Sequence, residues 1–231
     1  MNRIAVITGA SSGIGAALAR ALAGRWRLVL VARRKDRLDA LAEEISRDGG
    51  DAVALAADLT EDPHEVAVKA AAIWNGLDAI VNNAGFFATA SGDALTAEHL
   101  DALWRINVRA PMLLTSAAIP FLRARHGGSI VNVSSIAANA TFSGCAAYAA
   151  TKAAINAWSR VLREELRRDR IRVSVVAPGA TDTEVWPPGF NPPIDRMCRA
   201  ADIAAAIRFI LEQPATASID QMVITPPGGA L

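Results

Sequence analysis

The sequence predicts an α/β fold in which helices cover both faces of a doubly wound, parallel, seven-stranded sheet. Three observations lead to this prediction. Short apolar segments alternate with longer helix-favouring segments along the chain. Segments such as Leu28 to Ala32 are almost continuously apolar, which suits a strand buried on both faces. A glycine-rich turn directly follows the first of these segments. The length of 231 residues is compatible with a single domain, residues 1–231.

Seven segments are expected to form the strands because they are short, apolar and rich in β-branched residues. They are Ile4 to Thr8, Leu28 to Ala32, Ala52 to Ala56, Ala79 to Asn82, Ser129 to Ser134, Arg172 to Ala177 and Met222 to Thr225. Functional residues should follow the strands, because ligands of such sheets bind beyond the carboxyl ends.

The segments between the strands favour helices, and one proline-rich stretch, Trp186 to Pro193, is expected to be a loop within the domain. The expected helices are Gly13 to Ala23, Arg37 to Ser46, Glu65 to Trp74, His99 to Arg123, Ala146 to Arg167 and Ala201 to Glu212.

Composition excludes several classes of protein. Hydrophobic residues make up 52% of the chain, which is too many for a disordered protein. The net charge of +1 argues against a general nucleic-acid or anionic-membrane binder. Cys145 and Cys198 are too few for a disulfide framework, and the three histidines lack partners at metal-ligand spacing. We therefore expect a cytoplasmic protein without a metal site, a signal peptide or a membrane span.

The first predicted strand runs into a turn that contains Gly9, Gly13 and Gly15 and opens a helix. Glycine permits positive φ and close backbone approach, and the free N–H groups of a helix start attract phosphate. One glycine would serve only the shape of the turn, but three in a strand-turn-helix context favour a dinucleotide pyrophosphate.

Four motifs occur in order over nearly the whole chain: the turn Thr8 to Gly15, Asn82 to Gly85, Tyr148 to Lys152, and Pro178-Gly179 followed by Thr183. In these motifs the chain resembles the short-chain dehydrogenase/reductase family. The resemblance implies a Rossmann fold and an oxidoreductase. Such an enzyme moves a hydride between a nicotinamide cofactor and a small-molecule carbonyl or alcohol.

Arg33 and Arg34 follow the second predicted strand, where an NAD site usually presents an acidic residue to the adenosine ribose. A guanidinium suits a 2′-phosphate, so NADP(H) is the preferred cofactor and NAD(H) the alternative. Both arginines could instead be solvated, with Asp36 as the acidic group. We interpret Asp36 rather as a helix-start residue.

Tyr148 and Lys152 are four residues apart in a helix-favouring segment, so their side chains share a helical face. An ammonium about 4 Å from the phenol, at an effective dielectric near 20, would lower its pKa by up to about three units. We therefore expect Tyr148 to donate a proton during reduction and to accept one during oxidation. Hydride transfer itself belongs to the cofactor.

Further roles follow from the resemblance. It implies that Lys152 contacts the nicotinamide ribose and that Ser135 orients the substrate oxygen, with the adjacent Ser134 as its competitor. It also implies that Asn107 supports a water connection to the lysine. Asp58 is expected to approach the adenine, or else to act as a cap or turn acceptor.

The residues expected to contact the cofactor lie after the predicted strands or in the family motifs. They are Gly9, Ser11, Ser12, Gly13, Ile14, Gly15, Arg33, Arg34, Asp58, Leu59, Asn83, Ala84, Gly85, Tyr148, Lys152, Pro178, Gly179, Thr181 and Thr183. Cys145 and Trp186 are expected to border the substrate. The alternative for Cys145 is a small buried residue without a function, and the alternative for Trp186 is a packing role.

The chain also resembles the family branch that contains serine 3-dehydrogenase-like enzymes and clavulanic-aldehyde reductase. This resemblance lies in three segments, Ile224 to Gly229, Pro178 to Glu184 and Ser218 to Asp220. The resemblance also implies a homodimer or homotetramer, formed partly by the alanine-rich helix that carries Tyr148. Two rival functions remain at this stage: a nucleotide-sensing binding protein without turnover, because fold alone does not establish catalysis, and an isomerase or lyase that uses the same tyrosine.

Overall fold

The computed structural model describes residues 3–187 and 193–229, and it places seven strands in one parallel sheet. The order is β3-β2-β1-β4-β5-β6-β9, which confirms the predicted fold class. Residues 188–192 of the expected loop lie outside the described residues. The strands are β1 (Arg3–Thr8), β2 (Trp26–Ala32), β3 (Asp51–Ala56), β4 (Ala79–Asn82), β5 (Gly128–Val133), β6 (Ile171–Pro178) and β9 (Gln221–Ile224).

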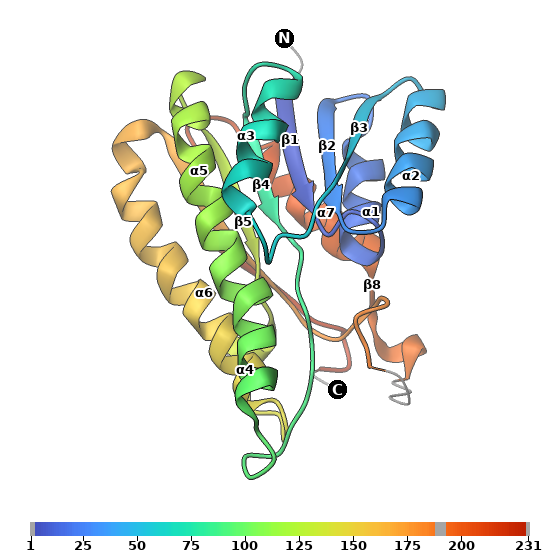
Figure 1. The fold of residues 1–231 in the computed structure, drawn as a ribbon, viewed down its shortest axis with the longest axis vertical. Coiled ribbons are helices and arrows are strands. Elements are labelled where there is room, and N and C mark those ends of the chain that lie inside the picture. The colour runs from blue at the N-terminus through green and yellow to red at the C-terminus, as the bar shows by residue number, and fades with distance from the viewer. Residues whose placement is uncertain (1–2, 188–192, 230–231) are drawn as a thin grey trace.

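Seven α-helices occur in the described parts of the chain, and they cover both faces of the sheet (Figure 1). The helices α1, α2 and α7 pack on one face, and α3, α5 and α6 on the other. None of the described helices is long and apolar enough to cross a membrane. They are α1 (Gly13–Leu22), α2 (Lys35–Arg47), α3 (Pro63–Ile73), α4 (Ala97–Trp104), α5 (Ala110–Ala124), α6 (Ala146–Glu165) and α7 (Ala200–Leu211).

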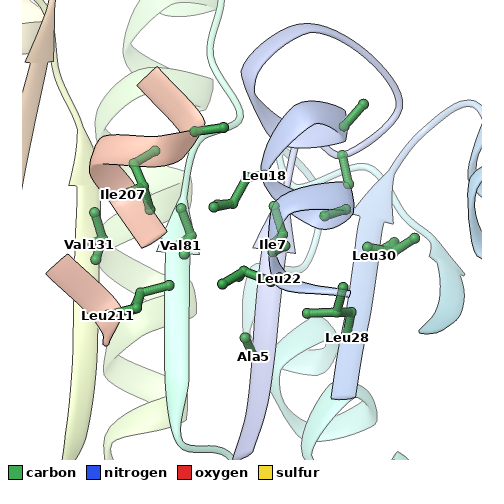
Figure 2. Close-up of a cluster of buried hydrophobic side chains, with 14 of the residues drawn as sticks. Ala5, Ile7, Leu18, Leu22, Leu28, Leu30, Val81, Val131, Ile207 and Leu211 are labelled. Atoms are coloured by element: carbon green, nitrogen blue, oxygen red, sulfur yellow. The ribbon is translucent and has the colours of Figure 1, made fainter. Parts of the chain in front are cut away.

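Strand β1 supplies side chains to both cores because successive residues of a strand point to opposite faces. Ile4 and Val6 contact the core under α3, α5 and α6, whereas Ala5 and Ile7 contact the core under α1 and α7. Figure 2 shows the second core, in which labelled side chains of α1 and α7 lie over the central strands. This two-sided burial explains why the strands read as continuous apolar runs.

The structure differs from the prediction in one helix. The expected single helix His99 to Arg123 is interrupted by a π-helical turn, Arg105–Arg109, between α4 and α5. Asn107 lies inside this turn and is buried, with its side chain bonded to Phe86 and Thr151. Tertiary hydrogen bonds of this kind carry no signal in the local pattern, and π turns often mark functional positions.

Two other features differ from the prediction. Helix α2 begins at Lys35, so Asp36 lies in its first turn and Arg34 occupies the capping position. A small parallel pair, β7 (Thr181–Asp182) with β8 (Cys198–Arg199), was not predicted, because strands of two residues have no readable periodicity.

The order of the strands reverses between β1 and β4, which are neighbours although β2 and β3 separate them in the chain. In open α/β sheets a crevice forms at the carboxyl ends of the strands beside such a switch point. The site should therefore lie where β1 and β4 end, next to the glycine turn.

Candidate active site

A cavity of about 1540 Å³ lies at the carboxyl ends of the strands. Residues from the ends of β1, β2, β3, β4, β5 and β6 line it, together with Tyr148 and Lys152 of α6. Every residue that the sequence predicted for cofactor, substrate or catalysis is part of this wall except Gly15 and Asn107. The fold thus brings together residues as far apart in the sequence as Gly9 and Trp186.

The glycine turn requires glycine at the predicted positions. Gly9 and Gly13 have φ of +67° and +52°, values that side chains rarely adopt. A Cβ at Gly15 would collide with the carbonyl oxygen of Gly9, and one at Gly13 would lie 3.0 Å from the Thr183 Cγ2. Gly15 therefore contributes to the site by letting α1 approach the end of β1, and not by lining the cavity.

Thr8 and Asn83 fix the ends of β1 and β4 to each other. The Thr8 hydroxyl accepts hydrogen bonds from the backbone N–H groups of Asn83 and Ala84, each at 3.0 Å, and donates to the Val81 carbonyl at 3.2 Å. The Asn83 amide donates to the Thr8 carbonyl at 2.9 Å. Because all these groups are paired, the floor of the cavity is held rigidly at the switch point.

Arg34 crosses the rim of the cavity and joins the glycine turn to the segment after β6. Its guanidinium donates to the Ser11 hydroxyl at 3.0 Å and the Ser12 hydroxyl at 2.7 Å, and to the Glu184 carboxylate at 2.8 Å. Arg37 donates to the same carboxylate at 2.6 Å. These hydrogen bonds, first from Arg34 and then from Arg37, lower the pKa of Glu184. Sequence reasoning did not single out Glu184 or Arg37, because the long-range pairing has no local signal.

Arg33 is exposed and lies on the cavity wall, as does Asp58. The Asp58 carboxylate accepts from the backbone N–H and the hydroxyl of Thr60, both at 2.8 Å. These bonds lower the pKa of Asp58, and the charge of Arg33 adds to the effect. Asp58 is therefore a turn acceptor in this structure while also facing the cavity.

Tyr148, Lys152 and Ser135 meet at the start of α6 and the end of β5. The Tyr148 side chain is hydrogen-bonded to that of Ser135. The Lys152 Nζ lies 5.6 Å from the centroid of the Tyr148 ring and donates to the Val133 carbonyl at 3.1 Å. The competitor Ser134 instead donates its hydroxyl to the Lys152 carbonyl at 3.3 Å. The two adjacent serines thus have different partners, and only Ser135 reaches the phenol.

The expected lowering of the Tyr148 pKa by Lys152 does not occur in this structure. Burial raises the pKa of Tyr148 to about 12, and the hydrogen bond with Ser135 opposes this shift only in part. Burial also lowers the pKa of Lys152 to about 8. Desolvation is thus the largest cause of both shifts, a cost that the spacing of four residues could not show.

Asn107 fixes the segment that follows β4. Its Oδ1 accepts from the Phe86 N–H at 2.9 Å, and its Nδ2 donates to the Phe86 carbonyl at 2.8 Å and to the Thr151 hydroxyl at 3.2 Å. A Cβ at Gly85 would lie 3.2 Å from Asn107 and 3.6 Å from the Lys152 Nζ. Asn107 thus lies behind the cavity wall, close to Lys152, and positions the chain next to α6.

Phe87 was not predicted as a site residue, although it lies two residues beyond the Asn82 to Gly85 motif. Its ring meets that of Tyr148 edge-on, with centroids 4.9 Å apart, and lies 5.3 Å from that of Trp186. The Trp186 indole donates to the Thr181 carbonyl at 2.9 Å. Cys145 is buried and lines the same cavity, and burial raises the pKa of its thiol.

A parallel α/β sheet, a glycine turn at the switch point and a Tyr–Lys pair in one cavity define a nucleotide-binding protein with an acid–base group. The family model described as short chain dehydrogenase matches residues 3–190. The chain therefore belongs to the short-chain dehydrogenase/reductase family and is an oxidoreductase of that family.

Several relatives resemble the chain over most of its length. An uncharacterized oxidoreductase of Methylorubrum extorquens is 41% identical over 187 residues, covering 79% of this chain and 75% of the relative. A short chain dehydrogenase from Burkholderia cenocepacia, solved in complex with NADP, is 33% identical with a TM-score of 0.86, covering 96% of each chain. An alcohol dehydrogenase from the archaeon Thermococcus sibiricus, complexed with 5-hydroxy-NADP, is 27% identical with a TM-score of 0.92, covering 100% of this chain and 99% of that one.

Proposed function

We propose that the protein is an NADP(H)-dependent oxidoreductase that interconverts an aldehyde or ketone and the corresponding alcohol. One observation carries the proposal. The Tyr148 hydroxyl is bonded to Ser135 and has Lys152 beside its ring, in the same cavity as the glycine turn. An acid–base hydroxyl next to a dinucleotide cradle is the arrangement that carbonyl reduction requires.

The residues of the cavity fit a nicotinamide dinucleotide phosphate. The glycine turn and the start of α1 offer backbone N–H groups to a pyrophosphate. Arg34, held against the Ser11 and Ser12 hydroxyls, supports a 2′-phosphate site, and Arg33 adds positive charge at the same rim. The two solved relatives described above contain NADP or a derivative of it. NADP(H) is therefore the proposed cofactor, with NAD(H) the alternative.

The cofactor, when bound, supplies or accepts the hydride. Tyr148 donates its proton to the carbonyl oxygen during reduction, and Ser135 orients that oxygen by a hydrogen bond. Lys152 stabilises the phenolate that remains. A phenol whose pKa is about 12 is protonated at neutral pH, which is the form that reduction needs.

We also propose that copies of the chain associate through the face formed by α4, α5 and α6. Each of these helices exposes an apolar side chain. They are Trp104, exposed to 44%, Leu113, to 40%, and Val161, to 59%. Large apolar side chains on adjacent helices favour a subunit interface, and the proposed assembly is a homodimer or homotetramer.

The test is a panel of aldehydes, ketones, 3-hydroxy acids and secondary alcohols, followed at the nicotinamide absorbance with both cofactors. We expect many turnovers with at least one substrate, one cofactor oxidised or reduced for each product molecule, and higher kcat/KM with NADP(H). Cofactor binding without turnover would instead indicate a nucleotide-sensing protein. Product formation without net cofactor oxidation would indicate an isomerase or lyase.

A further inference from the structure

The part of the cavity around Tyr148 has a different chemical character from the part around the glycine turn. Four ionisable side chains line the nucleotide part: Arg33, Arg34, Asp58 and Glu184. The rest of the described wall combines hydroxyl side chains, among them Ser135, Thr141 and Ser143, with apolar and aromatic ones. The apolar and aromatic side chains include Phe87, Phe142, Cys145, Trp186 and Met197, which we call the apolar end of the cavity.

Two charged residues of the wall need separate consideration. Lys152 is only 6% exposed, and its ammonium is bonded to the Val133 carbonyl. Arg105 is exposed and lies in the π-helical turn between α4 and α5. The five side chains of the apolar end itself carry no cation.

Phe87 is held in place at both sides. Asn107 binds the backbone N–H and carbonyl of the preceding residue, Phe86. Three residues beyond Phe87, the Ala90 N–H donates to the Gly144 carbonyl at 2.9 Å, which joins this segment to the loop before α6. A ring fixed in this way is preorganised for binding, because little conformational entropy is lost when a ligand packs on it.

The ring of Phe87 connects the acid–base group with the outer wall. It touches the ring of Tyr148 on one side and that of Trp186 on the other, both in edge-to-face geometry. A substituent on a carbonyl carbon held at Tyr148 would therefore meet aromatic surface. Apolar and aromatic groups gain free energy from such burial, whereas an unpaired carboxylate loses it.

We propose that the substrate is an uncharged carbonyl compound with an aromatic substituent, and that Phe87 sets this preference by packing against the substituent. The proposal rests on the proposed function and adds the class of substrate to it. It assigns to the apolar end a selection against carboxylates and to Phe87 a selection for rings.

The test compares the reduction of two keto esters by NADPH with the reduction of the corresponding keto acids. The pairs are methyl benzoylformate with benzoylformate, and ethyl acetoacetate with acetoacetate. We expect kcat/KM to be at least about 100-fold higher for each ester, because the acid must bury an unpaired charge. The kcat/KM for methyl benzoylformate should exceed that for ethyl acetoacetate by about 10-fold or more, because the phenyl ring of the former packs on Phe87.

Variants then separate a specific role of Phe87 from a structural one. Phe87→Ala should lower kcat/KM for methyl benzoylformate by about 10-fold, mainly through KM. It should change kcat/KM for ethyl acetoacetate by less than about 3-fold. Phe87→Leu should retain the preference for esters over acids. Val68→Ala is the control, because it removes an exposed apolar side chain of α3 outside the cavity wall. It should leave kcat/KM unchanged for both esters.

Equal or better turnover of the acids would overturn the proposed substrate class while leaving the oxidoreductase function intact. Equal losses on both esters in Phe87→Ala would overturn the role of Phe87, since a merely structural residue affects both substrates alike. No turnover of any carbonyl compound, with NADPH still bound, would overturn the proposed function itself and the substrate class with it.

Discussion

Glu184 is the residue that bears most directly on how Arg34 could meet a 2′-phosphate. Its carboxylate binds Arg34 and Arg37 at the place where a second anion would compete for the same guanidinium groups. The Glu184 side chain is 54% exposed, so solvent weakens the interaction. A carboxylate at this position therefore opposes a phosphate without excluding it.

Glu184→Gln should tighten NADPH binding by about two- to five-fold, because the variant removes an exposed negative charge beside the 2′-phosphate. NADH, which lacks that phosphate, should bind as before. Fluorescence titration of both cofactors measures the two dissociation constants. Glu164→Gln, an exposed acid on α6, is the control. Weaker NADPH binding would show that Glu184 mainly holds Arg34 in place.

Lys152 is a second residue whose burial has a measurable consequence. Its pKa is about 8 in the folded protein, below the ordinary value of 10.5. The unfolded chain therefore binds this proton more readily between pH 8 and 10.5, and the contribution of Lys152 to stability rises with pH over that range. At neutral pH the buried charge costs stability.

Lys152→Met should raise the free energy of unfolding at pH 7 by about 1 to 3 kcal/mol, because it removes a buried charge. This range already allows for the lost hydrogen bond to the Val133 carbonyl. The advantage should shrink between pH 8 and 10.5, because the folded lysine is already neutral there while the unfolded lysine loses its charge. Urea unfolding of both proteins at pH 7 and pH 10 measures the difference. A variant that is less stable at pH 7, or an advantage that grows with pH, would contradict the buried charge.

Among the elements, the glycine turn was predictable and the π turn was not. The turn depends on local chemistry, because positive φ and close backbone approach restrict the residue type at Gly9, Gly13 and Gly15. The π turn at Asn107 depends on bonds to Phe86 and Thr151, which are distant in sequence. The same reason explains why the contacts of Phe87 and Glu184 were missed.

Gly15→Ala should destabilise the protein by about 1 to 3 kcal/mol and weaken NADPH binding, because its Cβ would force α1 away from the Gly9 carbonyl. Gly92→Ala is the matched control, since no atom lies within 4 Å of its added Cβ and its φ is not positive. Thermal unfolding and a cofactor titration check both effects. Equal stability of the two variants would mean that the close approach does not matter.

At the scale of the whole molecule, the sheet was predicted because its signal is repeated in every strand. The central strands are apolar on both faces, and a helix connects each strand of the sheet to the next, so the parallel sheet follows from alternation alone. The cavity at the switch point follows from that topology. Its division into a charged and an apolar part does not follow, because it depends on which side chains the loops after β4 and β6 bring together.

The proposed assembly predicts a native mass of two or four times the 24.3 kDa chain. Leu113→Glu with Val161→Glu should shift that mass toward the single chain, because charges would enter the apolar face of α5 and α6. Light scattering after size-exclusion chromatography measures the mass, and Val68→Glu on α3 is the control. A wild-type protein with the mass of one chain would contradict the assembly.

The most direct test of the central claim is the rate of NADPH-dependent carbonyl reduction in Tyr148→Phe, measured together with NADPH affinity. The variant removes only the hydroxyl that is bonded to Ser135. Turnover should fall by about 100-fold or more, the range of positioned proton transfer, while the NADPH dissociation constant stays unchanged. Full activity with intact cofactor binding would contradict proton transfer by Tyr148.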